Sequence, residues 1–144
     1  MKMVINLLLG TGMAAFAEAM ALGEGLRLSS KILFDSLLGT PAVAPFLAAK
    51  REKMDNRNYE AEFPLRWMQK DMHLATVSAY ESGVALPLSN VAKEMYRLAM
   101  RDGHATEDFS AIAEFTIGNN RKERELNAIG DRSKAFETIG KKVA

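Results

Sequence analysis

Apolar residues fill most of the first 28 positions of the chain and fall on several faces when residues 2–23 are read as a helix. This pattern predicts a long first helix that is central and buried, and that ends at the glycines of positions 23 and 25. Five shorter helices are predicted after it, bounded by serine, aspartate, proline or glycine. They span 31–38, 42–54 or 45–54, 64–82, 87–100 or 87–101, and 109–117. The sequence therefore predicts an all-α fold in which about five shorter helices pack around a long first one.

Two other patterns overlap this first helix. Lys2, the apolar run from Val4 to Leu9 and the small-x-small site Ala17-Glu18-Ala19 are similar to a secretory signal, which would make the chain a processed, secreted helical protein. Asn6 and the glycines weaken the apolar core of such a signal. Residues 10–15, Gly-Thr-Gly-Met-Ala-Ala, match the G-x-G-x-x-A dinucleotide fingerprint, but no further strands are predicted to build the sheet it needs. A glycine pair that lets a neighbouring helix approach closely is the better interpretation.

Composition narrows the classes of function. With 144 residues, 48% of them hydrophobic, the chain is expected to form one domain with a substantial core. Its formal net charge is +1, with 12 Lys+Arg against 14 Asp+Glu in residues 1–118 and 7 against 4 in residues 119–144, so no nucleic-acid partner is expected. Asn6, Glu18 and Glu24 interrupt the longest apolar run, so no membrane span is expected. The absence of cysteine excludes disulfides and suits a cytoplasmic location, and with only two histidines we expect no metal site.

Lys2 and Asn6 are the first candidates for chemistry. Because they are four residues apart on a helix, they lie one turn from each other on the same face. A lysine at the end of an apolar helix can be partly removed from water and then exchange a proton near neutral pH, while the asparagine amide positions a substrate oxygen. A solvated lysine and an ordinary polar residue in the first helical turn are the alternative that this pair alone leaves open.

A second stretch, residues 63–75 (F-P-L-R-W-M-Q-K-D-M-H-L-A), gives these two residues a context. Together with K-x-x-x-N at 2–6, it resembles the C-terminal helical domain of the β-hydroxyacid dehydrogenases. That family includes 3-hydroxyisobutyrate dehydrogenase, tartronate semialdehyde reductase and the glyoxylate/succinic semialdehyde reductases. The resemblance covers residues 1–117 and extends to 17–19, Pro87, Gly103 and 108–111.

The resemblance implies roles for four residues. Lys2 would be the catalytic lysine, which gives a proton to the carbonyl oxygen in reduction and accepts one in alcohol oxidation. Asn6 would bind the substrate beside it. Lys70 would contact the nicotinamide cofactor, NAD or NADP, and Phe63 would line the same region. Asp71 would only orient its helix or meet a neighbouring chain.

The resemblance also sets expectations for the whole molecule. Leu9 stands where the related 6-phosphogluconate dehydrogenases, whose C-terminal domains share this all-α fold, carry a glutamate, and this favours a small hydroxyacid or semialdehyde as substrate. The family's N-terminal nucleotide-binding domain is missing. Residues 1–118 would therefore be a helical C-terminal dehydrogenase domain, inactive alone and part of a homo-oligomer (dimer or tetramer), and residues 119–144 a charged tail, helical or disordered. A non-catalytic helical oligomerisation or interaction module is the alternative.

Overall fold

Helices make up the regular secondary structure of the protein in the computed structural model, which describes residues 1–118. No strand occurs in this range, where the β-type pairing is an isolated bridge between Pro64 and Asp108. The predicted all-α fold is therefore confirmed, while the predicted tail, residues 119–144, lies outside the described residues. The elements are α1 (Lys2–Gly25), α2 (Ser30–Leu38), the 3₁₀ helix η1 (Pro45–Lys50), α3 (Arg51–Asp55), α4 (Leu65–Glu81), α5 (Pro87–Ala99), the π-helical turn η2 (Met100–His104) and η3 (Phe109–Ala111), which opens the helical stretch Phe109–Gly118.

Several helix ends carry the residues that local chemistry requires there. The hydroxyl of Ser29 caps α2 by accepting a hydrogen bond from the amide of Ile32 at 3.3 Å. Pro45 opens η1 and Pro87 opens α5, positions at which the missing amide hydrogen of proline costs nothing. After α5, Gly103 takes a φ of +108°, a conformation that side-chain-bearing residues rarely adopt, and this turn ends the helix.

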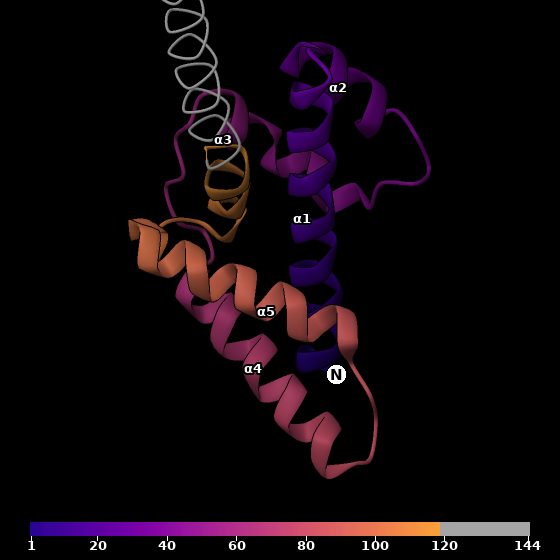
Figure 1. The fold of residues 1–144 in the computed structure, drawn as a ribbon, viewed down its shortest axis with the longest axis vertical. Helices are drawn as coiled ribbons and strands as arrows, with labels where there is room; N and C mark the ends of the chain where they lie inside the picture. Colours follow the sequence, from indigo (N-terminus) through magenta and orange to yellow (C-terminus); the bar gives the residue numbers. More distant parts are fainter. Residues whose placement is uncertain (119–144) are drawn as a thin grey trace, which may run out of the picture.

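The other helices pack around α1 (Figure 1). α4 and α5 cross its N-terminal half, where the hydroxyl of the fully buried Tyr96 donates a hydrogen bond to the carbonyl oxygen of Gly10 at 3.1 Å. α2 packs on the C-terminal half, where the ring centroids of Phe16 and Phe34 lie 6.1 Å apart. The predicted long first helix packed by shorter ones is thus confirmed. The largest buried side chains between these helices are mostly methionines: Met13, Met20, Met68 and Met72.

Gly10 lets α4 approach α1 closely, as the glycine pair in this helix predicts. A Cβ atom at Gly10 would lie 2.6 Å from Sδ of Met72 and 3.0 Å from Sδ of Met68. At Gly12 the nearest atoms, on the Phe46 ring, would be 3.5 Å away, which is an ordinary van der Waals distance. Only the first glycine is therefore needed for close packing. Residues 10–15 lie within α1, so they do not form a dinucleotide-binding turn.

The prediction that α1 is buried on several faces is wrong for one of them. Ile5 and Leu8 are 50% and 69% exposed, and no other part of residues 1–118 covers them. By length and composition alone, α1 is also long and apolar enough to cross a membrane. Asn6, Glu18 and Glu24, which interrupt its apolar run, had led us to expect no membrane span. Packing of its other face against α4 and α5 accounts for much of that apolar composition. The buried residues of α1 are Asn6, Gly10, Met13, Ala14, Phe16, Ala17, Met20, Ala21 and Gly23.

A buried charged cluster joins the segment before α4 to the helical stretch at 109–118. Asp108 is fully buried, and one of its oxygens accepts a hydrogen bond from Nζ of Lys50 at 3.1 Å. The carboxylate also accepts hydrogen bonds from the amides of Glu62 and Phe63 and from the amide and hydroxyl of Ser110. Burial acts to raise the pKa of Asp108, but the hydrogen bonds from Ser110 and Lys50 outweigh it, so the pKa is lowered. The cluster therefore holds an ionised carboxylate in the core.

Candidate active site

Asn6 in the second turn of α1 and Asp71 in the second turn of α4 are joined by a short hydrogen bond. The amide Nδ2 of Asn6 donates to Oδ2 of Asp71 at 2.6 Å, across 65 positions of the sequence. Asn6 is only 9% exposed, and the side chain of Asp71 only 12%. A buried amide needs a partner of this kind because an unpaired one is costly. The contact therefore fixes the rotation of both helices at this end of the molecule.

Lys70 completes this contact from the solvent side. Its Nζ lies 3.1 Å from Oδ1 of Asp71, so each oxygen of that carboxylate has a partner. The Lys70 side chain is 50% exposed, and its Nζ lies 5.2 Å from the centroid of the Trp67 ring. Two of the predicted site residues, Asn6 and Lys70, are thus brought together through Asp71.

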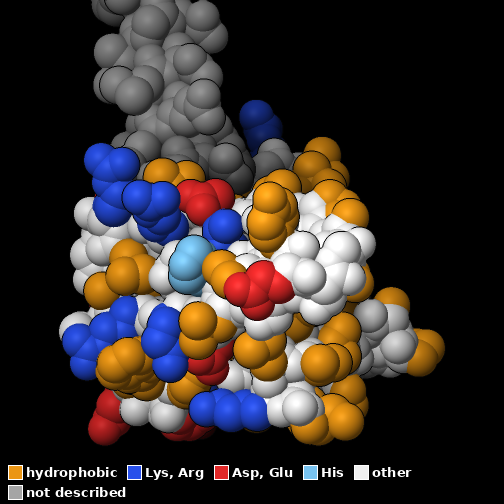
Figure 2. All heavy atoms as spheres, turned by 90° about the horizontal axis from the view of Figure 1, so that it is seen from below, with side chains coloured by type: hydrophobic (Ala, Val, Ile, Leu, Met, Phe, Trp, Pro, Cys, Tyr) orange, Lys and Arg blue, Asp and Glu red, His pale blue; other side chains and the backbone are white. Residues whose placement is uncertain are grey.

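Lys2 lies beside the same group of residues. It lines a hollow of about 310 Å³ together with Met1, Met3, Asp71 and Leu74. The expected removal of Lys2 from water is not found within residues 1–118, because its side chain is exposed. Figure 2 views the molecule from below, where hydrophobic side chains lie open to solvent between basic and acidic ones. The hollow thus offers apolar walls, one ammonium and one carboxylate to a small ligand.

Phe63 occupies a different environment from the other three predicted residues. Its ring packs edge-on against the buried Phe109, with the centroids 6.2 Å apart. The ring of Phe46 also stacks on Phe109, with the centroids 6.4 Å apart. The backbone amide of Phe63 donates to Asp108 at 3.3 Å. Phe63 is half-buried at the start of α4, two turns before Lys70. It is thus placed to anchor α4, and its predicted contact with the cofactor stays a prediction.

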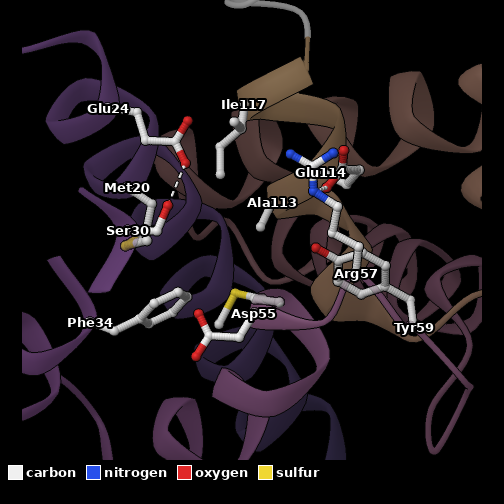
Figure 3. A pocket seen from close by; sticks show the side chains of 11 residues that line it. Met20, Glu24, Ser30, Phe34, Asp55, Arg57, Tyr59, Ala113, Glu114 and Ile117 are labelled. Atoms are coloured by element: carbon white, nitrogen blue, oxygen red, sulfur yellow. Dashed lines mark hydrogen bonds and ion pairs between the residues drawn. The ribbon is translucent and has the colours of Figure 1, made fainter. Parts of the chain in front are cut away.

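A second hollow, of about 200 Å³, lies near the other end of α1 (Figure 3). On one wall the hydroxyl of Ser30 donates a hydrogen bond to Oε1 of Glu24 at 3.1 Å, and on the opposite wall Nε of Arg57 lies 3.7 Å from Oε2 of Glu114. Burial is the main cause of a raised pKa at Glu114, with His104 opposing the rise. Because Glu24 is about 18 helical residues from Asn6, roughly 27 Å along α1, this hollow is separate from the one beside Lys2.

Asp71 is the residue that sequence reasoning left without a role in the site. Two signals in the sequence could have found it. Asn6 shares its face of α1 with Met13 and Met20, so a buried amide in need of a partner is predictable there. Asp71 follows Met68 by three residues, which places it at the edge of the buried face of α4. What the sequence could not supply was that these two faces meet.

The comparisons with known proteins place this chain in a family. The model of the family described as NAD-binding of NADP-dependent 3-hydroxyisobutyrate dehydrogenase matches residues 1–116. The chain belongs to that family. The prediction of a β-hydroxyacid dehydrogenase relative, made from residues 2–6 and 63–75, is therefore confirmed at the level of the family, and NAD or NADP is the cofactor that the family's description implies.

Individual relatives are similar over most of this chain. Glyoxylate/succinic semialdehyde reductase 2, chloroplastic, of Arabidopsis thaliana is 35% identical over 114 residues, which are 79% of this chain and 32% of that protein. The NAD-dependent L-serine dehydrogenase of Pseudomonas aeruginosa is 32% identical over 118 residues, 77% of this chain and 40% of that protein. The crystal structure of 3-hydroxyisobutyrate dehydrogenase from Salmonella typhimurium superposes with a TM-score of 0.75 at 25% identity, covering 79% of this chain and 40% of that one. The chain thus spans about a third of the length of the curated relatives it matches.

Proposed function

We propose that residues 1–118 form the helical C-terminal domain of an NAD(P)-dependent β-hydroxyacid dehydrogenase, acting on a small hydroxyacid or semialdehyde. The observation that carries the proposal is the Asn6–Asp71–Lys70 contact beside the hollow that contains Lys2. This contact joins the two stretches of sequence on which the family resemblance rests. Membership of the 3-hydroxyisobutyrate dehydrogenase family supports the same reaction class.

Lys2 handles the proton in this proposal. Its ammonium donates a proton to the substrate's carbonyl oxygen during reduction, and its amine accepts one from the hydroxyl group during oxidation. Asn6 holds the oxygen beside it. One hydrogen of the Asn6 amide is committed to Asp71 at 2.6 Å, so the other hydrogen and the carbonyl oxygen are available to the substrate. Asp71 thereby fixes which way the amide points.

Lys70 and Phe63 are proposed to contact the cofactor, which supplies or accepts the hydride when bound. A half-exposed ammonium next to an aromatic side chain suits a ligand that carries both phosphates and a flat ring. Residues 1–118 contain no strand, so the nucleotide-binding sheet has to be supplied from outside this range. Closure of such a domain over the Lys2 end of α1 would remove from water a lysine that the described residues leave exposed.

The proposal is tested by Lys2→Ala in a protein that joins this chain to a nucleotide-binding domain, for example that of the Arabidopsis reductase. We expect turnover of glyoxylate or succinic semialdehyde to fall by about 10²–10⁴-fold, the usual contribution of a positioned acid–base group. Cofactor binding, followed by the fluorescence of NADPH and NADH, should stay unchanged. Lys31→Ala is the matched control, because Lys31 is exposed and lies on α2. Turnover retained in Lys2→Ala would refute the assignment.

A second candidate function is a non-catalytic helical oligomerisation or interaction module. The exposed apolar side chains at the start of α1 favour it, since Met1 is 91% exposed, Val4 59% and Leu8 69%. The two functions are distinguished by measuring assembly and cofactor binding together. A tight oligomer that carries a nucleotide-binding domain yet binds neither NADH nor NADPH would favour the module. The homo-oligomer and the cytoplasmic location stay predictions in both cases.

A further inference from the structure

The second hollow, at the C-terminal end of α1, is lined by groups that the proposed dehydrogenase site does not use (Figure 3). Its walls come from α1, α2, α3, the loop after α3 and the helical stretch Phe109–Gly118, so segments far apart in the sequence meet there. Its volume of about 200 Å³ is smaller than the roughly 300–1,000 Å³ of sites for drug-sized molecules, so it suits a smaller ligand. The apolar part of its lining consists of Met20, Phe34, Met54, Ala113 and Ile117.

The hydroxyl group of Tyr59 points into this hollow without a hydrogen-bond partner among residues 1–118 (Figure 3). Tyr59 is only 8% exposed, and polar groups buried to this degree are nearly always paired. Burial, together with the charges of Glu114 and Glu107, raises the pKa of the hydroxyl group, so it stays neutral and can both donate and accept a hydrogen bond. A buried hydroxyl group that faces a cavity without a partner indicates a site for a ligand.

The charged residues on the walls give the hollow a negative balance. They are three carboxylates and one guanidinium group: Glu24, Asp55, Glu114 and Arg57. Asp55 also lies beside Arg51, which is not part of the lining and whose Nε is 3.3 Å from Oδ2 of Asp55. The lining therefore favours a cationic ligand over a neutral or anionic one.

Glu114 is the lining carboxylate best placed to bind such a cation. Its ion pair with Arg57 is loose, since Nε and Oε2 lie 3.7 Å apart, which is too far for a hydrogen bond. Burial raises the pKa of Glu114, and the negative charge of Glu24 adds to the rise, so a cation in the hollow would stabilise the charged form. The charge of Glu114 acts on the hydroxyl group of Tyr59, so these two groups lie near each other.

We propose that this hollow binds a small primary amine, whose ammonium group contacts the carboxylate of Glu114 and the hydroxyl oxygen of Tyr59 and whose carbon chain lies against the apolar wall. A primary ammonium group carries three hydrogen-bond donors, enough for both oxygens. An alcohol of the same size lacks the charge, and a carboxylate would be repelled. Because the hollow is about 27 Å from Asn6 along α1, the amine would not compete with the proposed substrate, and the proposal does not depend on the proposed function.

Binding is measured by NMR on the 144-residue chain with ¹³C-labelled methionine methyl groups. Met20 and Met54 line the hollow, whereas Met68 and Met72 lie between α1 and α4 and serve as internal references. The probes are butylammonium, 1-butanol and butyrate, which are similar in size and differ in charge. At low ionic strength we expect butylammonium to shift the Met20 and Met54 signals with a Kd on the order of 1 mM, and the other two probes to leave them nearly unchanged.

Two variants test the contacts of the ammonium group. Glu114→Gln should weaken butylammonium binding by about 10–100-fold and Tyr59→Phe by about 2–10-fold, as expected for a charged and a neutral hydrogen bond. Glu94→Gln and Tyr80→Phe are the matched controls, because both residues are exposed and lie outside the lining, on α5 and α4. Both controls should bind butylammonium like the wild type.

The proposal has several ways to fail. Equal binding of all three probes would show an apolar hollow without a preference for charge. Butylammonium binding that Glu114→Gln leaves unchanged would remove the carboxylate from the site, and the absence of any saturable shift would remove the site itself. Binding that appears only after removal of residues 119–144 would assign the hollow to that segment of the chain and not to a free amine. Each of these results would overturn the proposal.

Discussion

Replacing Asp108 with alanine should test whether the buried charged cluster holds the domain together. Asp108 is 0% exposed, and Lys50, whose side chain is 8% exposed, depends on it for its buried partner. The substitution leaves this ammonium with Glu62, which is 67% exposed. It also removes the acceptor for the amides of Glu62 and Phe63 and the cap of the 109–118 helical stretch.

The size of the effect follows from two costs. Removing one partner of a buried ion pair destabilises proteins by about 3–5 kcal/mol. Losing an N-cap side chain costs about 1 kcal/mol. Because Lys50 keeps its contact with Glu62 and the two losses share one carboxylate, they do not add fully. We therefore expect Asp108→Ala to lower the free energy of unfolding by about 3–4 kcal/mol, a large part of the roughly 5–15 kcal/mol of a typical domain.

Urea unfolding followed by circular dichroism, at one protein concentration, measures this loss. With a slope of about 1–3 kcal/mol per molar urea, the midpoint should fall by about 2 M. Asp35→Ala is the matched control, since Asp35 also pairs with two cations, Lys31 and Arg51, but on the surface, and its midpoint should stay close to wild type. A loss below about 1 kcal/mol for Asp108→Ala, or equal losses for both variants, would refute the role given to burial.

The pH dependence of stability tests the role of Asp108 independently. The pKa of Asp108 is lowered in the folded protein, so its ionised form stabilises the fold. This contribution is fully present above the ordinary aspartate pKa of about 3.9 and is lost as the pH falls through the lowered value. The difference between wild type and Asp108→Ala should therefore be constant near neutral pH and shrink in acid. A difference that grows in acid would contradict the lowered pKa.

Three further variants test the packing of α1 and the second hollow. Gly10→Ala brings a methyl group against Met72 and should lower the free energy of unfolding by about 1–3 kcal/mol. Gly12→Ala, which has room for its methyl group, should raise that free energy by about 0.5–1 kcal/mol. Thermal unfolding measures both changes, and a gain in stability for Gly10→Ala would contradict the close approach of α4 to α1. Glu114→Gln should raise the melting temperature at neutral pH, because burial raises the pKa of Glu114 and so disfavours its charged form. This gain should vanish below the ordinary glutamate pKa of about 4.3, where the carboxyl group is protonated in both the folded and the unfolded protein. A gain that persists in acid would contradict the raised pKa of Glu114.

Sequence patterns predicted the helices of this protein well because their ends are set by local chemistry. Ser29, Pro87 and Asp108 stand at or next to the first residues of their elements, as expected from capping and from the properties of proline. The third helix was predicted less well, since residues 45–55 divide into a 3₁₀ helix and a short α-helix. Nothing in the spacing of apolar residues distinguishes these two helical forms over so few turns.

The site was predictable only in part, for a reason that α1 makes clear. Periodicity says which residues share a face: Asn6 with Met13 and Met20, or Leu8 with Ala15 and Leu22. It does not say which of two apolar faces the chain itself will cover, and α1 has two. Among residues 1–118, the first face meets α4, where Asp71 fixes Asn6, and the second, with Leu8 and Leu22, is exposed.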